Sequence, residues 1–155
     1  MIIRNYGLFW DIQKVDWGWQ NKIGSLKGYL DGDKLHPVDF REQAAIYALY
    51  DPSFNLVYVG QVGSQTQKLF SRLKQHLDDD LQNRWRYFSW FGVRIVNSSN
   101  TLKDAPQTVN ENLDTILNHL EAIAISVSEP KLNKKGGSWV GAERYYQHDK
   151  ATSTA

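Results

Sequence analysis

Cysteine is absent from this 155-residue sequence, and its absence excludes three kinds of chemistry. Without thiols, the chain can form no disulfide framework, no thiolate metal site and no cysteine nucleophile. Long apolar runs are also missing, so no segment reaches the roughly 20 residues that a transmembrane helix needs. The first residues, 1–6 (MIIRNY), lack the pattern of a secretory signal. These absences favour a cytoplasmic protein that does not bind a membrane.

A marked excess of one charge is missing as well. The sequence has 18 Lys and Arg residues against 17 Asp and Glu residues, a net charge of +1, so its overall charge does not indicate a nucleic-acid partner. Basic side chains do gather locally, on a polar turn and before an aromatic run. The candidates for phosphate contact in these places are Lys131, Lys134, Lys135 and Arg84. Such clusters are commonly solvated surface, and phosphate contact becomes the better interpretation only beside a phosphodiester site.

The length of the chain suits one domain with a real core. We predict a core domain over residues 43–147, an aromatic-rich N-terminal extension over residues 1–42, and a fraying tail over residues 148–155. Glycines divide the extension into short strands or loops. Its tryptophans either cover the core sheet, which we favour for Trp10, or stack on nucleic-acid bases, for which Trp17 and Trp19 are better placed.

Two short runs predict a β-hairpin. Residues 45–50 (AIYALY) and 56–60 (LVYVG) are rich in the β-branched and aromatic residues that suit strands. Residues 51–55 (DPSFN) between them are mostly turn formers. The hairpin therefore places Tyr47 and Tyr58 on adjacent strands.

A helix and a third strand are expected next. The helix runs to about Leu81 and places Arg72 and His76 four residues apart, on one flank. Its buried stripe consists of leucines at fourfold spacing: Leu69, Leu73 and Leu77. Residues 85–96 are β-prone and predict the third strand, with Gly92 as a possible bulge.

A second helix is predicted from a capping box formed by Thr108 and Glu111, and it ends before Pro130. Its expected apolar face consists of Leu113, Ile116, Leu117, Leu120, Ala124 and Val127. At 100° per residue, Glu121 lies at the rim of that face.

The order and spacing of these residues resemble the GIY-YIG nuclease superfamily over about residues 44–137. The two strand motifs stand here as Ala45-Ile46-Tyr47 and Tyr58-Val59-Gly60. The positions that match after the motifs are Arg72, His76, Glu121 and Asn133. The resemblance implies an α+β sandwich in which a small, mainly antiparallel sheet of three core strands is flanked by helices.

The resemblance also implies the catalytic roles. Tyr47 is implied as the general base, helped by His76, and Tyr58 and Arg72 as contacts of the scissile phosphate. A tyrosine ordinarily has a pKa of about 10, so Tyr47 would need a nearby cation to gain phenolate character. Arg72 and a metal ion are the expected cations.

The implied metal is one divalent ion on Glu121, Mg²⁺ or Mn²⁺, since carboxylate oxygen suits these ions. Gly60 and Asn133 are implied to support the site. The expected function is metal-dependent hydrolysis of phosphodiester bonds in nucleic acid, with DNA as the expected substrate. Two alternatives stay open: a GIY-YIG fold that binds nucleic acid without cleaving it, and an interaction module whose tryptophan-rich N-terminus binds a protein.

Overall fold

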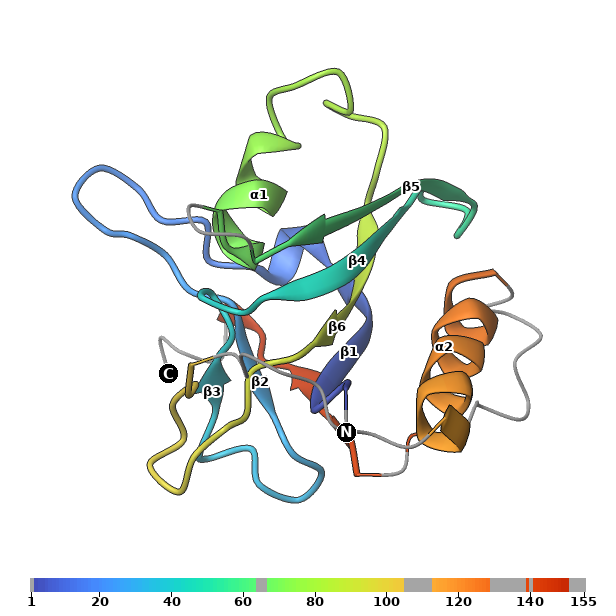
Figure 1. Cartoon of the computed structure of the whole chain (residues 1–155). Coiled ribbons are helices and arrows are strands. Elements are labelled where there is room, and N and C mark those ends of the chain that lie inside the picture. Colours follow the sequence, from blue (N-terminus) through green and yellow to red (C-terminus); the bar gives the residue numbers. More distant parts are fainter. Residues whose placement is uncertain (1, 64–66, 105–112, 129–138, 140, 151–155) are drawn as a thin grey trace.

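The computed structural model of the chain describes residues 2–63, 67–104, 113–128, 139 and 141–150. Its main element is a five-stranded sheet with the strand order β5-β4-β6-β1-β7 (Figure 1). These strands are β1 (Asn5–Asp11), β4 (Ala45–Tyr50), β5 (Leu56–Val62), β6 (Tyr87–Gly92) and β7 (Glu143–Arg144). Neighbouring strands are antiparallel except β1 and β7, which are parallel.

A smaller sheet, a short 3-10 helix and two α-helices complete the described fold. The small sheet has the order β3-β2-β8 and contains β2 (Lys27–Tyr29), β3 (Val38–Asp39) and β8 (Tyr146–Gln147). A short 3-10 helix, η1 (Ile12–Lys14), follows β1, and the α-helices are α1 (Leu69–Gln75) and α2 (Leu113–Ser128). The predicted α+β class is confirmed. None of the described helices is long and apolar enough to cross a membrane.

The hairpin of β4 and β5 forms as predicted. The carboxylate of Asp51 accepts hydrogen bonds from the backbone N–H groups of Ser53 and Asn55, each at 2.9 Å. This side chain replaces backbone partners in the turn, as aspartate commonly does. The predicted three core strands, β4, β5 and β6, are present, but β1 and β7 extend the sheet to five. β1 comes from residues 1–42, so that segment supplies a strand next to β6.

The two central strands β4 and β6 of the five-stranded sheet are buried on both faces. Residues alternate along a strand, so Ala45, Tyr47 and Leu49 belong to a core cluster that includes residues of α1. Ala48 and Tyr50 belong to a second cluster that includes Val127 of α2. The two helices therefore cover opposite faces of the sheet (Figure 1).

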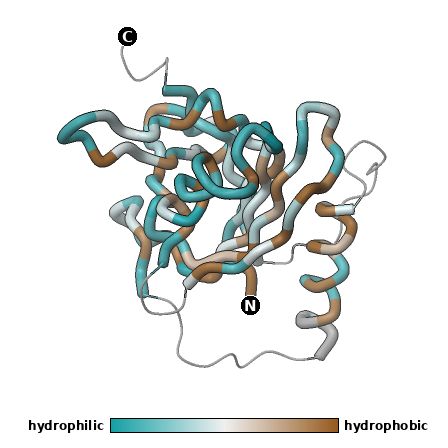
Figure 2. Tube along the Cα trace, turned by 90° about the horizontal axis from the view of Figure 1, so that it is seen from above, coloured by the Kyte–Doolittle hydropathy of each residue, from teal (hydrophilic) through white to brown (hydrophobic). Residues whose placement is uncertain are grey.

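Helix α2 contacts the sheet through a different face from the predicted one. Ala122 and Ser126 are buried, whereas Leu117 and Leu120 are 52% and 54% exposed; Ala124 is exposed as well. Of the predicted apolar face, Val127 is buried as expected, and apolar residues recur along the helix (Figure 2). The side chains of Leu113 and Ile116 lie outside what is described, as do Thr108, Glu111 and Pro130.

Polar contacts explain this rotation of α2. The hydroxyl of Tyr50 donates to the carbonyl groups of Ser126 and Val127 at 3.4 and 3.2 Å. The Nδ1 atom of His119 accepts from the backbone N–H of Ile3 at 3.2 Å. Hydrophobic periodicity does not report such long-range hydrogen bonds, and the small Ala122 and Ser126 side chains let the helix lie close to the sheet.

Two elements are shorter in the structure than the sequence predicts. Helix α1 ends at Gln75, not near Leu81, because the indole of Trp85 donates to the carbonyl of His76 at 3.0 Å and caps the helix there. Strand β6 covers only 87–92 of the predicted 85–96. Gly92 is its last residue and not a bulge; in the pairing of β6 with β1, the register shifts in β1, between Gly7 and Trp10.

The N-terminal tryptophans have three different environments. Trp10 is 2% exposed in the core, which confirms the prediction that it covers the sheet. The indole of Trp17 is partly buried and packs on Phe70 of α1, with ring centroids 5.4 Å apart. Trp19 is 80% exposed. It lies in a projecting loop whose ends are paired by a bridge between residues 16 and 25 (Figure 1).

Candidate active site

The register of the hairpin places the two motif tyrosines on the same face of the sheet. Tyr47 pairs with Gly60, and Leu49 pairs with Tyr58. The ring centroids of Tyr47 and Tyr58 are 6.1 Å apart. Tyr47 has no exposed surface, whereas Tyr58 is partly buried.

Gly60 has a clear steric role beneath Tyr47. A Cβ atom at this position would lie 2.5 Å from Oη and 2.6 Å from Cζ of Tyr47, and 2.7 Å from Cε1 of Tyr58. The phenol of Tyr47 therefore lies directly against the backbone of β5. Only glycine permits this close approach.

His76 joins the tyrosines from the C-terminal end of α1. Its Nε2 atom and the hydroxyl of Tyr47 are 2.8 Å apart, and its ring centroid is 5.0 Å from that of Tyr58. His76 is 1% exposed. The imidazole is therefore fixed between α1 and the sheet.

Arg72 lies one turn before His76 and supplies the positive charge. Its Nη1 atom donates to Oε1 of Gln75 at 2.8 Å, and its guanidinium also interacts with the Tyr47 hydroxyl. Burial nevertheless raises the pKa of Tyr47 to about 12, and the hydrogen bond with Arg72 lowers it only in part. With Arg72 as the cation beside it, the phenol is protonated at neutral pH.

One side chain in this group was missed by the sequence reasoning. Oδ2 of Asp79 lies 2.8 Å from Nδ1 of His76, and Oδ1 accepts from the backbone N–H of Leu81 at 2.9 Å. The hydrogen bond from Leu81, with a contribution from His76, lowers the pKa of Asp79. The acidic run 78–80 (DDD) directly after the histidine was the available signal.

Glu121 is not brought to this group. It is exposed on α2, whose buried residues pack on the face of the sheet opposite Tyr47. Among the residues that the structure describes, no three His, Cys, Asp or Glu side chains form a group that could hold a metal ion.

The predicted substrate contacts are only partly described. Arg84 is exposed in the turn before Trp85. The remaining predicted positions lie outside the described residues: Asn133, Lys131, Lys134 and Lys135.

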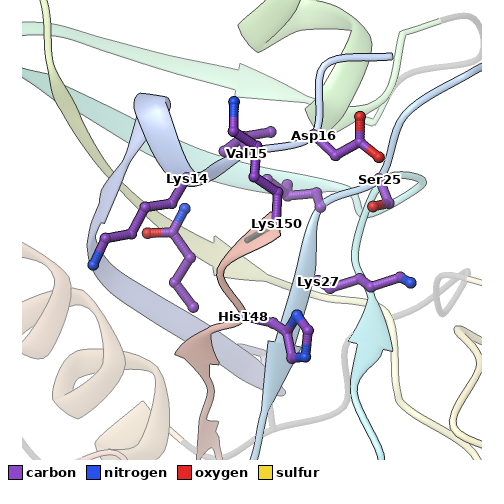
Figure 3. Close-up of a pocket in the computed structure, with 9 residues that line it drawn as sticks. Lys14, Val15, Asp16, Ser25, Lys27, His148 and Lys150 are labelled. Atoms are coloured by element: carbon purple, nitrogen blue, oxygen red, sulfur yellow. The ribbon is translucent and has the colours of Figure 1, made fainter. Parts of the chain in front are cut away.

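A small basic cavity lies away from this group, between η1, β2 and the residues after β8 (Figure 3). Its volume is about 10 Å³, which is room for about one water molecule. Its lining includes Lys14, Lys27, His148 and Lys150. In Figure 3, the side chains of Lys14 and Lys27 point away from each other.

Comparison of the chain with protein families, with curated proteins and with solved structures finds no match. The GIY-YIG resemblance therefore stays a prediction, carried by the motif residues and their arrangement.

Proposed function

We propose that the protein is a nuclease that hydrolyses phosphodiester bonds in nucleic acid, with DNA as the expected substrate. The observation that carries the proposal is the hydrogen bond between Tyr47 and His76, at 2.8 Å, beside Arg72 and Tyr58. Hydrolysis needs a group that takes a proton from water and positive charge near the phosphate oxygens. Both are present on one face of the sheet.

The burial of the side chains suggests how a substrate would meet this face. Arg72 and Tyr58 are partly exposed, whereas Tyr47 is covered. A phosphate would therefore contact Arg72 first, because guanidinium pairs with phosphate oxygens through two N–H groups. As Arg72 turns from the Tyr47 hydroxyl to the phosphate, water gains access to that hydroxyl.

The residues described do not fit a metal ion shared between Glu121 and the tyrosines, because α2 covers the other face of the sheet. No step of the proposed reaction is assigned to an ion. Dependence on Mg²⁺ or Mn²⁺ stays a prediction of the resemblance. This dependence is tested by measuring cleavage with each ion and with EDTA. If Glu121 holds the ion, Glu121→Ala should abolish cleavage without loss of stability.

A second candidate is a module that binds nucleic acid without cleaving it. The position of Glu121 on the opposite face favours this reading, as does the complete burial of Tyr47. Such a module would keep the aromatic and histidine packing for stability alone.

Cleavage and binding assays separate the two candidates. Supercoiled plasmid and labelled single- and double-stranded oligonucleotides are incubated with the protein and Mg²⁺ or Mn²⁺, and binding is measured in parallel by fluorescence anisotropy. A nuclease converts the substrates to shorter products. Binding without product formation in any metal would support the module and reject the nuclease.

A further inference from the structure

Three hydrogen bonds fix the position of His76. The indole of Trp85 donates to its carbonyl at 3.0 Å, Asp79 contacts Nδ1 and Tyr47 contacts Nε2, each at 2.8 Å. With 1% of the residue exposed, no solvent competes for either ring nitrogen. Asp79 and Tyr47 therefore decide which of the two ring nitrogens carries the proton of the neutral ring.

The chemistry of a carboxylate determines the direction of these bonds. The lowered pKa of Asp79 keeps it ionised at neutral pH, and an ionised carboxylate only accepts hydrogen bonds. Nδ1 of His76 must then carry a proton and donate it to Oδ2 of Asp79. In the neutral ring, Nε2 has no proton and accepts from the hydroxyl of Tyr47.

We propose that Asp79 is a positioning residue: it holds His76 in the tautomer whose Nε2 accepts the proton of Tyr47. This inference rests on the proposed nuclease function for its catalytic consequence, but the tautomer itself does not depend on that function. It assigns to His76, rather than to a resting tyrosine phenolate, the role of final proton acceptor.

The proton and electron balance of the step is straightforward. As the oxygen of water forms its bond to phosphorus, its proton passes to Oη of Tyr47 and the hydroxyl proton of Tyr47 passes to Nε2 of His76. The electron pair of the broken P–O bond stays on the departing oxygen, which takes a proton from solvent. The imidazolium keeps its Nδ1 hydrogen bond to Asp79, and it later returns its proton through Tyr47 to water.

The groups around the ring are consistent with this assignment. Tyr47 and Tyr58 face it from the sheet, and the charged groups nearby are Arg72 of α1 and Asp79. The negative Asp79 stabilises a positive ring, and Arg72 is drawn toward the phosphate when substrate binds.

The test is Asp79→Asn, with Asp80→Asn as the matched control because Asp80 is an exposed acid in the same run. In Asp79→Asn, the amide oxygen of the new side chain should accept the hydrogen bond from the backbone N–H of Leu81. The NH₂ group of the asparagine then faces Nδ1 of His76. A donor at that place favours the other tautomer, with the proton on Nε2. The ring nitrogens are read by ¹⁵N NMR with ¹⁵N-labelled histidine.

We expect the neutral His76 ring to carry its proton on Nδ1 in the wild type and in Asp80→Asn, and on Nε2 in Asp79→Asn. Cleavage by Asp79→Asn should fall by about 10²- to 10⁴-fold, the usual contribution of a general base. The wild-type spectrum is informative even if the variant does not fold. An Nε2–H ring in the wild type would overturn the assignment.

The activity data distinguish the remaining outcomes. If the tautomer changes in Asp79→Asn but cleavage does not, the catalytic positioning role is rejected. If the wild type has an Nδ1–H ring but cuts no nucleic acid, the positioning by Asp79 is supported and the nuclease proposal fails.

Discussion

The substitution Gly60→Ala tests the packing of the candidate site. The added Cβ would lie within 2.5–2.7 Å of Tyr47 and Tyr58 atoms, well inside van der Waals contact. Tyr47 is fully buried, so its ring cannot move aside without displacing its neighbours. Overpacking of this kind costs about 1–3 kcal/mol.

An opposing effect must be subtracted. The backbone of Gly60 does not adopt a positive φ, so alanine would restrict the unfolded chain and stabilise the protein by about 0.4–1 kcal/mol. With the middle of each range, the net expectation is a loss of about 1 kcal/mol in the free energy of unfolding. For a chain of this size, that corresponds to a fall of about 2–4 °C in Tm.

Urea denaturation and thermal melts of Gly60→Ala measure this loss. Val59→Ala is the control, because Val59 is on the same strand and 50% exposed. It should change stability little. A Gly60→Ala protein as stable as the wild type would show that Tyr47 does not lie against the β5 backbone as described.

Three further predictions concern other parts of the chain. Trp10→Ala should cost about 3–5 kcal/mol in urea denaturation, whereas Trp19→Ala should leave stability within about 0.5 kcal/mol and weaken oligonucleotide binding by about 1–3 kcal/mol if its indole stacks on a base. Asp11→Asn should lower the free energy of unfolding at neutral pH, because Asp11 accepts two hydrogen bonds from Arg86 at 2.7 and 2.9 Å and asparagine has only one acceptor oxygen. The hydrogen bond from Arg86 lowers the pKa of Asp11 below its ordinary 3.8. This contribution to stability is therefore present above pH 3.8 and disappears as the pH falls through the lower pKa of the folded state. If the wild type became more stable relative to Asp11→Asn as the pH fell, the prediction would be contradicted. Arg72→Ala should abolish cleavage and Arg72→Lys restore only part of it, as lysine lacks the planar guanidinium; equal rates for all three proteins would place the phosphate contact elsewhere.

The parts of the site that the sequence predicts are the ones set by local rules. The β4–β5 hairpin follows from strand composition and turn residues, and its register alone brings Tyr47 beside Tyr58. The spacing of Arg72 and His76 on one flank of a helix likewise follows from helical geometry. These elements need no distant contact to be recognised.

The remaining features depend on contacts distant in sequence. The insertion of β1 beside β6 joins residues about 80 positions apart, and no local pattern indicates it. The face of α2 is set by bonds to Ile3 and Tyr50. Because α2 lies on the second face of the sheet, Glu121 does not join Tyr47, which the spacing along the chain could not show.

The most direct test of the nuclease proposal is the single-turnover cleavage rate of Tyr47→Phe relative to the wild type, measured on plasmid with Mg²⁺ or Mn²⁺. The variant keeps the ring and loses the hydroxyl that bonds to His76, so its stability should fall by no more than about 1–3 kcal/mol, the cost of an unpaired buried nitrogen. We expect the wild type to cut the plasmid and the folded variant to cut it about 10²- to 10⁴-fold more slowly. A wild type that cuts no substrate, or a folded variant that cuts at the wild-type rate, would contradict the proposal that Tyr47 and His76 carry out phosphodiester hydrolysis.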